Sequence, residues 1–170
     1  MNGRSLVPWE SRTAVHGLTF HNSRSGQNCY SAVLSESQSK SPMPRQPIHS
    51  DSAPKAIGPY SQAVRAGNTL YLSGQTPLDP ATGEMVAGGI EEQATRVFEN
   101  LKAVLAAAGA GFDDVVRVAI YMTDLGNFAA VNEVMKRYFY EPYPARSTIG
   151  VAALPRGAAV EIDVIAVTGG

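Results

Sequence analysis

The last quarter of the chain constrains the fold most strongly, because it predicts two β-strands joined by a turn. The first strand is expected over residues 147–152, a stretch rich in β-branched residues such as Thr148. The second is expected over Val160–Val167, with a turn at residues 154–157, Leu-Pro-Arg-Gly. Proline fixes φ in such a turn, and glycine tolerates a positive φ. One face of the second strand is apolar and is formed by Val160, Ile162, Val164 and Ala166.

Charged side chains accompany these two strands. Glu161 and Asp163 alternate with the apolar residues, so they share the other face of their strand, about 7 Å apart. Arg146 directly precedes the first strand. If the two strands pair, the arginine and a carboxylate meet at one end of the sheet. Two interpretations stay open: an ion pair that closes a strand end, or a guanidinium that binds a substrate carboxylate beside an acid that moves a proton.

The remaining pattern predicts an α+β fold, a mixed β-sheet with two helices on one face. The expected elements are a hairpin of residues 63–66 and 69–73 across Gly67-Asn68, a short strand near 84–86, a helix over 90–108, a strand over Val115–Met122 and a helix over 128–140. The positions expected to face the core are Ile90, Ala94, Val97, Phe98, Leu101, Val104 and Leu105 in the first helix, Val116, Val118, Ile120 and Met122 in the strand, and Phe128, Val131, Met135 and Tyr138 in the second helix. Asn132 lies off that stripe. Ile165 and Val167 leave the second sheet face partly apolar, which predicts association.

Composition limits the function classes. A hydrophobic content of 44% in 170 residues fits one domain with a modest core, and no apolar run approaches the ~20 residues of a membrane span. Cys29 is the single cysteine, which excludes a disulfide within the chain and a cysteine metal cluster. Residues 1–50 carry five Lys/Arg against two Asp/Glu, and the remainder carries nine against thirteen. An acidic core is a poor electrostatic match for nucleic acid, so we do not expect a nucleic-acid partner.

Residues 1–47 differ from the rest of the chain, being rich in serine and poor in acids, without sustained periodicity. We expect them to form a disordered extension or linker, and residues 48–170 to form the single domain. Three origins remain open for the extension: an upstream segment with Met43 as the true start, an organellar transit peptide, or a regulatory tail. The expected location is therefore the cytoplasm, or an organelle if residues 1–42 form a transit peptide.

A series of short motifs gives the chain a resemblance to a known family. The motifs are Pro-Ala-Arg at 144–146, Val-Ala-Ala-Leu-Pro-Arg-Gly at 151–157, Val-Glu-Ile-Asp-Val-Ile-Ala-Val at 160–167, Ala-Pro-Lys-Ala-Ile-Gly-Pro-Tyr-Ser-Gln at 53–62, Leu-Ser-Gly-Gln at 72–75, Asp-Pro-Ala-Thr-Gly at 79–83, Asn-Leu-Lys-Ala at 100–103, Asp-Leu at 124–125 and Phe-Ala-Ala-Val-Asn at 128–132. In this order they resemble the Rid family, also called YjgF, of enamine and imine deaminases. The resemblance covers about residues 48–169.

The resemblance implies a chorismate-mutase-like fold, a homotrimer with active sites between subunits, and no metal or cofactor. The implied reaction is hydrolysis of 2-imino acids and their enamines, such as 2-aminoacrylate, to 2-keto acids and ammonia, a metabolite-damage-control role. The implied catalytic residues are Arg146 for the substrate carboxylate, Glu161 for the proton, and Tyr60 as a cap. The implied substrate-binding residues are Ser73, Gly74, Thr148 and Asn132. Thr148 departs from many bacterial relatives, which have cysteine there, so substrate preference is open.

Without the resemblance, plainer interpretations of these residues stand. Tyr60 is a packed aromatic, Gly74 sits in a turn at a strand end, and Asn132 is a surface residue. Two other functions also remain: an RNA-cleaving inhibitor of translation, and a non-catalytic ligand-binding or chaperone-like trimer.

Deletion of residues 1–42 tests the predicted domain boundary. Because this segment has no pattern that buries apolar surface, its removal should leave the fold and the melting temperature of the protein unchanged. Thermal melting of the full and shortened chains compares the two directly. A melting temperature that falls by many degrees on truncation would show that the extension docks on the domain.

Overall fold

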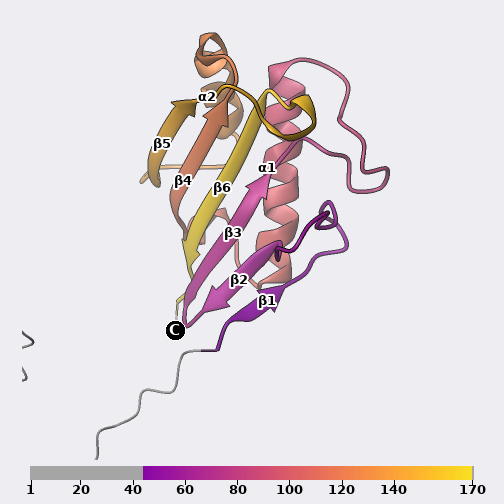
Figure 1. The fold of residues 1–170 in the computed structure, drawn as a ribbon. Coiled ribbons are helices and arrows are strands. Elements are labelled where there is room, and N and C mark those ends of the chain that lie inside the picture. Colours follow the sequence, from indigo (N-terminus) through magenta and orange to yellow (C-terminus); the bar gives the residue numbers. More distant parts are fainter. Residues whose placement is uncertain (1–43, 170) are drawn as a thin grey trace, which may run out of the picture. The chain divides into compact units, whose positions relative to one another are not determined.

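The computed structural model describes residues 44–169, and most of the predicted extension lies outside this range (Figure 1). The strands are β1 (Gln46–Ile48), β2 (Ala63–Ala66), β3 (Thr69–Gln75), β4 (Val115–Met122), β5 (Ala145–Gly150) and β6 (Val160–Val167). The helices are α1 (Ile90–Ala107) and α2 (Phe128–Met135), with short 3₁₀ turns at Phe112–Asp114, Leu125–Asn127 and Pro155–Gly157. The predicted α+β class is confirmed.

The six strands form one mixed sheet in the order β1-β2-β3-β6-β4-β5. Neighbouring strands are antiparallel except for β4 and β5, which are parallel. The last two strands do not pair with each other, because β4 lies between β5 and β6. The nine residues between these strands carry the chain across β4, a distance of about two strand spacings, or roughly 10 Å. Strand β5 also begins two residues earlier than expected, at Ala145.

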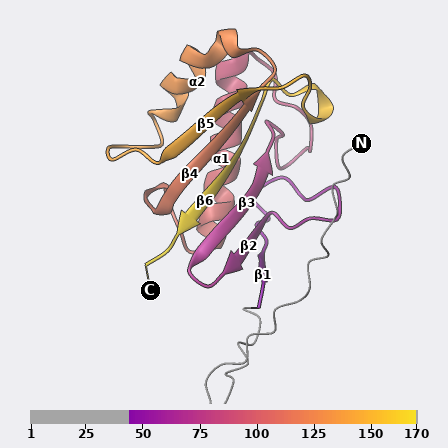
Figure 2. The ribbon, with the colours of Figure 1, turned by 60° about the vertical axis from the view of Figure 1, so that its left-hand side comes forward.

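Both helices cover the same face of the sheet, as Figure 2 shows. The predicted stripe of α1 is confirmed, since Phe98, Leu101 and Leu105 are fully buried against the sheet. Glu91 and Glu92 occupy the first turn, where carboxylates interact favourably with the helix dipole. The predicted buried face of β6 is also confirmed. Its alternate residues, Val160, Ile162, Val164 and Ala166, belong to the core.

The second helix is shorter than its periodicity predicts. Its final turns tighten, because the amides of Arg137 and Tyr138 donate to carbonyls three residues back rather than four. Phe139 is consequently buried in an aromatic cluster with Phe98, Phe112 and Tyr138. Phe128 was expected to face the core, but it begins the helix and remains 39% exposed.

Two strands also differ from expectation. A β-bulge between Val115 and Arg117 shifts the register of β4, so Val115 is buried and Val116 is 48% exposed. The predicted strand near residues 84–86 is only an isolated bridge between Leu78 and Met85. The additional strand of the sheet is β1, which begins at the end of the segment that we expected to be an extension.

The second face of the sheet has no covering layer in the described chain. Tyr71, Ile149 and Val167 are exposed on it, and Ile165 is partly exposed, as predicted from the alternation in β6. Neither described helix is long and apolar enough to cross a membrane. The open face is therefore partly apolar, and it also carries the carboxylates of Glu161 and Asp163. A partly apolar face of this kind favours association.

Candidate active site

Glu161 lies over a glycine in the neighbouring strand. The pairing of β3 with β6 shifts between Leu72 and Gln75, so β3 contains one extra residue there. A side chain at Gly74 would overlap the Glu161 carboxylate, because its Cβ would lie only 2.9 Å from the Cδ of Glu161. Glycine at this position thus allows the carboxylate to lie against the backbone of β3.

The Glu161 carboxylate is half-buried, and within the described residues it has no hydrogen bond and no ion-pair partner. Burial raises its pKa above the ordinary value, and the negative charge of Asp163 on the same strand face raises it further. Asp163 in turn raises the pKa of Tyr121 through a hydrogen bond and its charge. A carboxylate whose pKa is raised can take up and release a proton closer to neutral pH.

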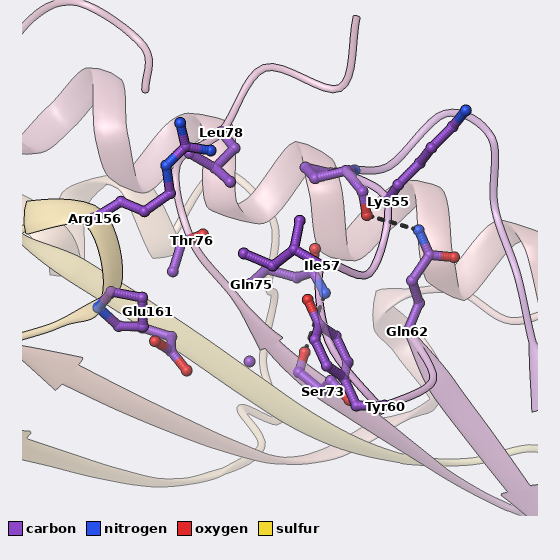
Figure 3. A pocket seen from close by; sticks show the side chains of 13 residues that line it. Lys55, Ile57, Tyr60, Gln62, Ser73, Gln75, Thr76, Leu78, Arg156 and Glu161 are labelled. Carbon is purple, nitrogen blue, oxygen red and sulfur yellow. Dashed lines mark hydrogen bonds between the residues drawn. The ribbon is translucent and has the colours of Figure 1, made fainter. Parts of the chain in front are cut away.

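Beside Glu161 is a cavity of about 310 Å³, which we call the Glu161 cavity (Figure 3). Its lining consists of Pro54, Lys55, Ile57, Tyr60, Gln62, Ser73, Gly74, Gln75, Thr76, Leu78, Pro155, Arg156 and Glu161. Tyr60 is exposed at its edge, so it is not a packed core aromatic. The Ser73 hydroxyl donates a 2.6 Å hydrogen bond to the carbonyl of Ser61, and in this way holds the loop that carries Tyr60.

Arg146 lies at a second cavity, next to α2. Its Nη1 donates a 2.6 Å hydrogen bond to Oδ1 of Asn132, and its guanidinium lies 5.2 Å from the centre of the Phe128 ring. These contacts hold the guanidinium in one orientation. The second cavity, here called the Arg146 cavity, has a volume of about 450 Å³ and is lined by Ala129, Asn132, Glu133, Met135, Lys136, Tyr143, Pro144 and Arg146.

Within one chain, Arg146 and Glu161 do not meet. Arg146 is paired with Val118, which is buried beneath the helices, whereas Glu161 is paired with Tyr121 on the open face. Positions 118 and 121 of a strand point to opposite faces, so the two charged side chains do as well. The two cavities share no lining residue, and residues 44–169 contain no ion pair between Arg146 and Glu161. The expected contact at one sheet end is therefore absent within one chain, which also excludes an intrachain ion pair.

The predicted site residues thus divide into two groups. Tyr60, Ser73, Gly74 and Glu161 line the Glu161 cavity, whereas Arg146 and Asn132 line the Arg146 cavity. Thr148 lines neither, although alternation places it on the same strand face as Arg146. Its buried hydroxyl oxygen has no hydrogen-bond partner in the part of the chain that the structure describes.

Several lining residues were missed by the sequence analysis. Arg156 was considered only as part of a turn, yet it lines the Glu161 cavity with a φ of 57°. Its guanidinium donates to the carbonyl of Gly83 at 2.7 Å and to Glu84 at 3.4 Å. A charged residue between proline and glycine was the signal that could have identified it. Gln62 gave no such signal, because its contacts depend on tertiary structure.

Comparisons with known proteins agree on one family. The family model described as endoribonuclease L-PSP matches residues 50–168. The protein DfrA of Myxococcus xanthus is 65% identical over 128 residues, which cover 74% of this chain and 98% of the relative. A 2-iminobutanoate/2-iminopropanoate deaminase of Dermatophagoides farinae is 52% identical, with 73% and 97% covered. The crystal structure of E. coli TdcF with bound serine is similar with a TM-score of 0.69 and 42% identity, covering 73% of this chain and 99% of that one.

The titration of Glu161 tests the electrostatics of this site. We expect its carboxyl group to titrate above the ordinary value of 4.5, because burial and Asp163 both disfavour the charged form. Asp163→Asn should lower the pKa of Glu161 only in part, since burial is the larger cause. Carbon-detected NMR of the side-chain carboxyl measures both values. A Glu161 pKa at or below 4.5 in the unmodified protein would contradict this electrostatic description.

Proposed function

From the premise that this chain belongs to the Rid (YjgF) family, we propose that it hydrolyses small 2-imino acids and their enamine tautomers to 2-keto acids and ammonia. The observation that carries this proposal is the Glu161 carboxylate over Gly74, half-buried and unpaired within the described residues, with a raised pKa beside an open cavity. Such a group is suited to proton transfer. The deaminase of Dermatophagoides farinae supports the same reaction class.

The proposed chemistry needs one group that moves protons. An enamine first gains a proton from solvent at its terminal carbon and becomes an iminium, whose C2 is the electrophile. Glu161 then accepts a proton from water as the water oxygen bonds to C2. Glu161 returns that proton to the nitrogen of the resulting carbinolamine, the C–N bond breaks, and ammonia leaves. As the C=O bond of the keto acid forms, the hydroxyl proton passes to Glu161 and from there to solvent. Because the substrate is itself electrophilic, orientation and proton transfer are sufficient, and we propose no cofactor.

Arg146 is the proposed ligand of the substrate carboxylate. A guanidinium presents two parallel N–H groups to a carboxylate, and the contacts with Asn132 and Phe128 orient it. The serine bound in the E. coli relative is likewise a small molecule with a carboxylate and a nitrogen on one carbon. Tyr60 would cap the site from the edge of the Glu161 cavity.

Arg146 and Glu161 can act on one substrate if they come from different subunits. Each chain has two half-sites on opposite faces of its sheet, and a cyclic assembly places the Arg146 half of one subunit against the Glu161 half of the next. The apolar open face supplies a surface for this contact. We therefore propose a homotrimer with three sites between subunits, as the family resemblance implies.

The family model's description as an endoribonuclease makes RNA cleavage the alternative. The described residues carry ten Lys/Arg against thirteen Asp/Glu, so the described part of the chain is net acidic. Nucleic-acid binding depends on basic surface and weakens steeply with salt. RNA cleavage that persisted, with such salt dependence, in a preparation without deaminase activity would favour the alternative.

Substitutions of Arg146 and Glu161 test the proposed roles. Arg146→Lys keeps the charge but loses the planar two-bond geometry, so kcat/KM should fall by roughly 10- to 100-fold. Glu161→Gln keeps the shape but cannot move a proton, so kcat should fall by about 10²–10⁴. Both kcat and kcat/KM are measured in a coupled assay that generates 2-aminoacrylate in the reaction mixture. Arg137→Lys and Glu91→Gln are matched controls, since these exposed residues form an ion pair outside both cavities.

The same variants separate catalysis from stability. A raised pKa means that ionising Glu161 costs folding stability, a cost absent below the unfolded pKa and complete above the folded one. At about pH 7, Glu161→Gln should therefore melt at or above the temperature of the unmodified protein, and the difference should close as the pH falls towards about 4. A normal rate in Glu161→Gln would eliminate its role as the proton carrier.

The assembly is tested by light scattering with size-exclusion chromatography. We expect a mass of three times the 18.0 kDa chain, because the open sheet face is partly apolar and neither cavity contains both charged groups. A monomer mass at micromolar concentration would leave the two half-sites apart and would contradict the proposed site.

A further inference from the structure

Two irregular segments form opposing walls of the Glu161 cavity. The first wall, residues 50–60, contributes Pro54, Lys55, Ile57 and Tyr60, and the second wall, residues 76–86, contributes Thr76 and Leu78 (Figure 3). Within the first wall, Tyr60 to Gly58 is the one backbone hydrogen bond among the described contacts. Residues 55–60 are all exposed, and Ile57 is 74% exposed. Such a segment has little internal support for a fixed conformation.

Gln62 supports the first wall from the interior. Its side chain is 2% exposed, and its Oε1 accepts a 2.7 Å hydrogen bond from the amide of Ser50. Its Nε2 lies within hydrogen-bond distance of the carbonyls of Ser50, Ala53 and Pro54, at 3.1, 3.4 and 2.9 Å. One carboxamide thus uses its acceptor and both donors on a single segment of the chain.

Asn100 of α1 supports the second wall from the interior, as Gln62 supports the first. It is 1% exposed, and its Nδ2 donates to the carbonyls of Thr76 and Leu78 at 3.2 and 3.0 Å. These contacts connect the wall to the most regular helix of the fold. Both carboxamides are buried, so the wall carbonyls would lose their partners in any variant without the donor.

We propose that Gln62 and Asn100 are positioning residues that each set the place of one wall of the Glu161 cavity, and thereby control how tightly substrate is held there. The expected effect on substrate binding rests on the proposed function, whereas the placement of the two walls by Gln62 and Asn100 does not. Gln62 places the wall that carries Ile57 and Tyr60, and Asn100 places the wall that carries Thr76 and Leu78. The two residues act independently, because their hydrogen bonds share no partner.

The test uses Gln62→Met and Asn100→Leu, which keep side-chain size and remove the hydrogen bonds. Hydrogen exchange of the full chain should accelerate by about tenfold or more at the hydrogen-bonded amides of the first wall, such as Ser50 and Tyr60, for Gln62→Met. For Asn100→Leu it should accelerate in residues 76–86, and in each variant the other wall should not change. Binding of 2-oxobutanoate, the product of 2-iminobutanoate hydrolysis, should weaken by roughly tenfold in both. KM should rise by a similar factor while kcat changes by less than about threefold. The reason is that these variants weaken the binding of substrate but leave the proton carrier Glu161 intact.

Leu105→Ala is the control for general destabilisation. Leu105 is fully buried near the end of α1 and lines neither cavity, so this variant should melt earlier without local exchange or a change in KM. If either carboxamide variant fails to fold, Gln62→Asn and Asn100→Ser replace it, since a shorter polar group leaves room for a bridging water. These milder variants should show the same separation of the two walls at smaller amplitude.

The outcomes distinguish this inference from the proposed function. Exchange that accelerates evenly over the chain, or in both walls together, would overturn it, as would 2-oxobutanoate affinity equal to that of the unmodified protein. An unmodified protein that neither deaminates nor binds 2-oxobutanoate would refute the proposed function. The exchange pattern would still decide whether the two carboxamides place the walls.

Discussion

The contact of the Glu161 carboxylate with the backbone at Gly74 is the constraint on which the site depends. It requires β6 beside β3, an extra residue in β3, and glycine at the position where any side chain would overlap the carboxylate. The arrangement removes the carboxylate from part of its solvent and places Asp163 on the same strand face. Within one chain, strand pairing and backbone geometry therefore raise the pKa of this group, through burial first and the charge of Asp163 second.

The position of β6 also determines what one chain lacks. Because β4 lies between β5 and β6, and because Arg146 and Glu161 face opposite sides of the sheet, one chain cannot bring them together. The proposed symmetric assembly overcomes this separation by bringing different faces of neighbouring subunits together. Activity would then depend on association. The partly apolar open face would contribute to the contact between subunits and, through Glu161, to the site that this contact completes.

Local signals were sufficient for much of the fold. The stripe of α1, the hairpin of β2 and β3, and the buried face of β6 each follow from side-chain periodicity and turn residues, and the structure confirms them. The pairing of strands is a long-range property, so the chain's local pattern could not show that β4 separates β5 from β6. The bulge that exposes Val116 likewise depends on the partner strand. The exposure of Phe128 reflects its place at the start of a helix beside Arg146.

The sequence pointed to some of the residues that line the two cavities, but not to their arrangement. The family motifs identified Glu161, Arg146, Tyr60 and Gly74, whereas their division between two cavities appears only in three dimensions. Gln62 and Asn100 could not be identified from spacing, since their partners lie 8–12 and 22–24 residues away along the chain.

Complementation between two inactive variants tests the shared site most directly. Arg146→Ala keeps the Glu161 half and Glu161→Gln keeps the Arg146 half, so mixed trimers contain some sites in which both intact halves face each other. In a cyclic trimer assembled at random from equal amounts of the two chains, about a quarter of the sites regain both groups. We predict that co-refolded mixtures recover roughly that fraction of the deaminase activity, whereas each variant alone stays inactive. Mixed trimers that form but remain inactive would contradict a site shared between subunits.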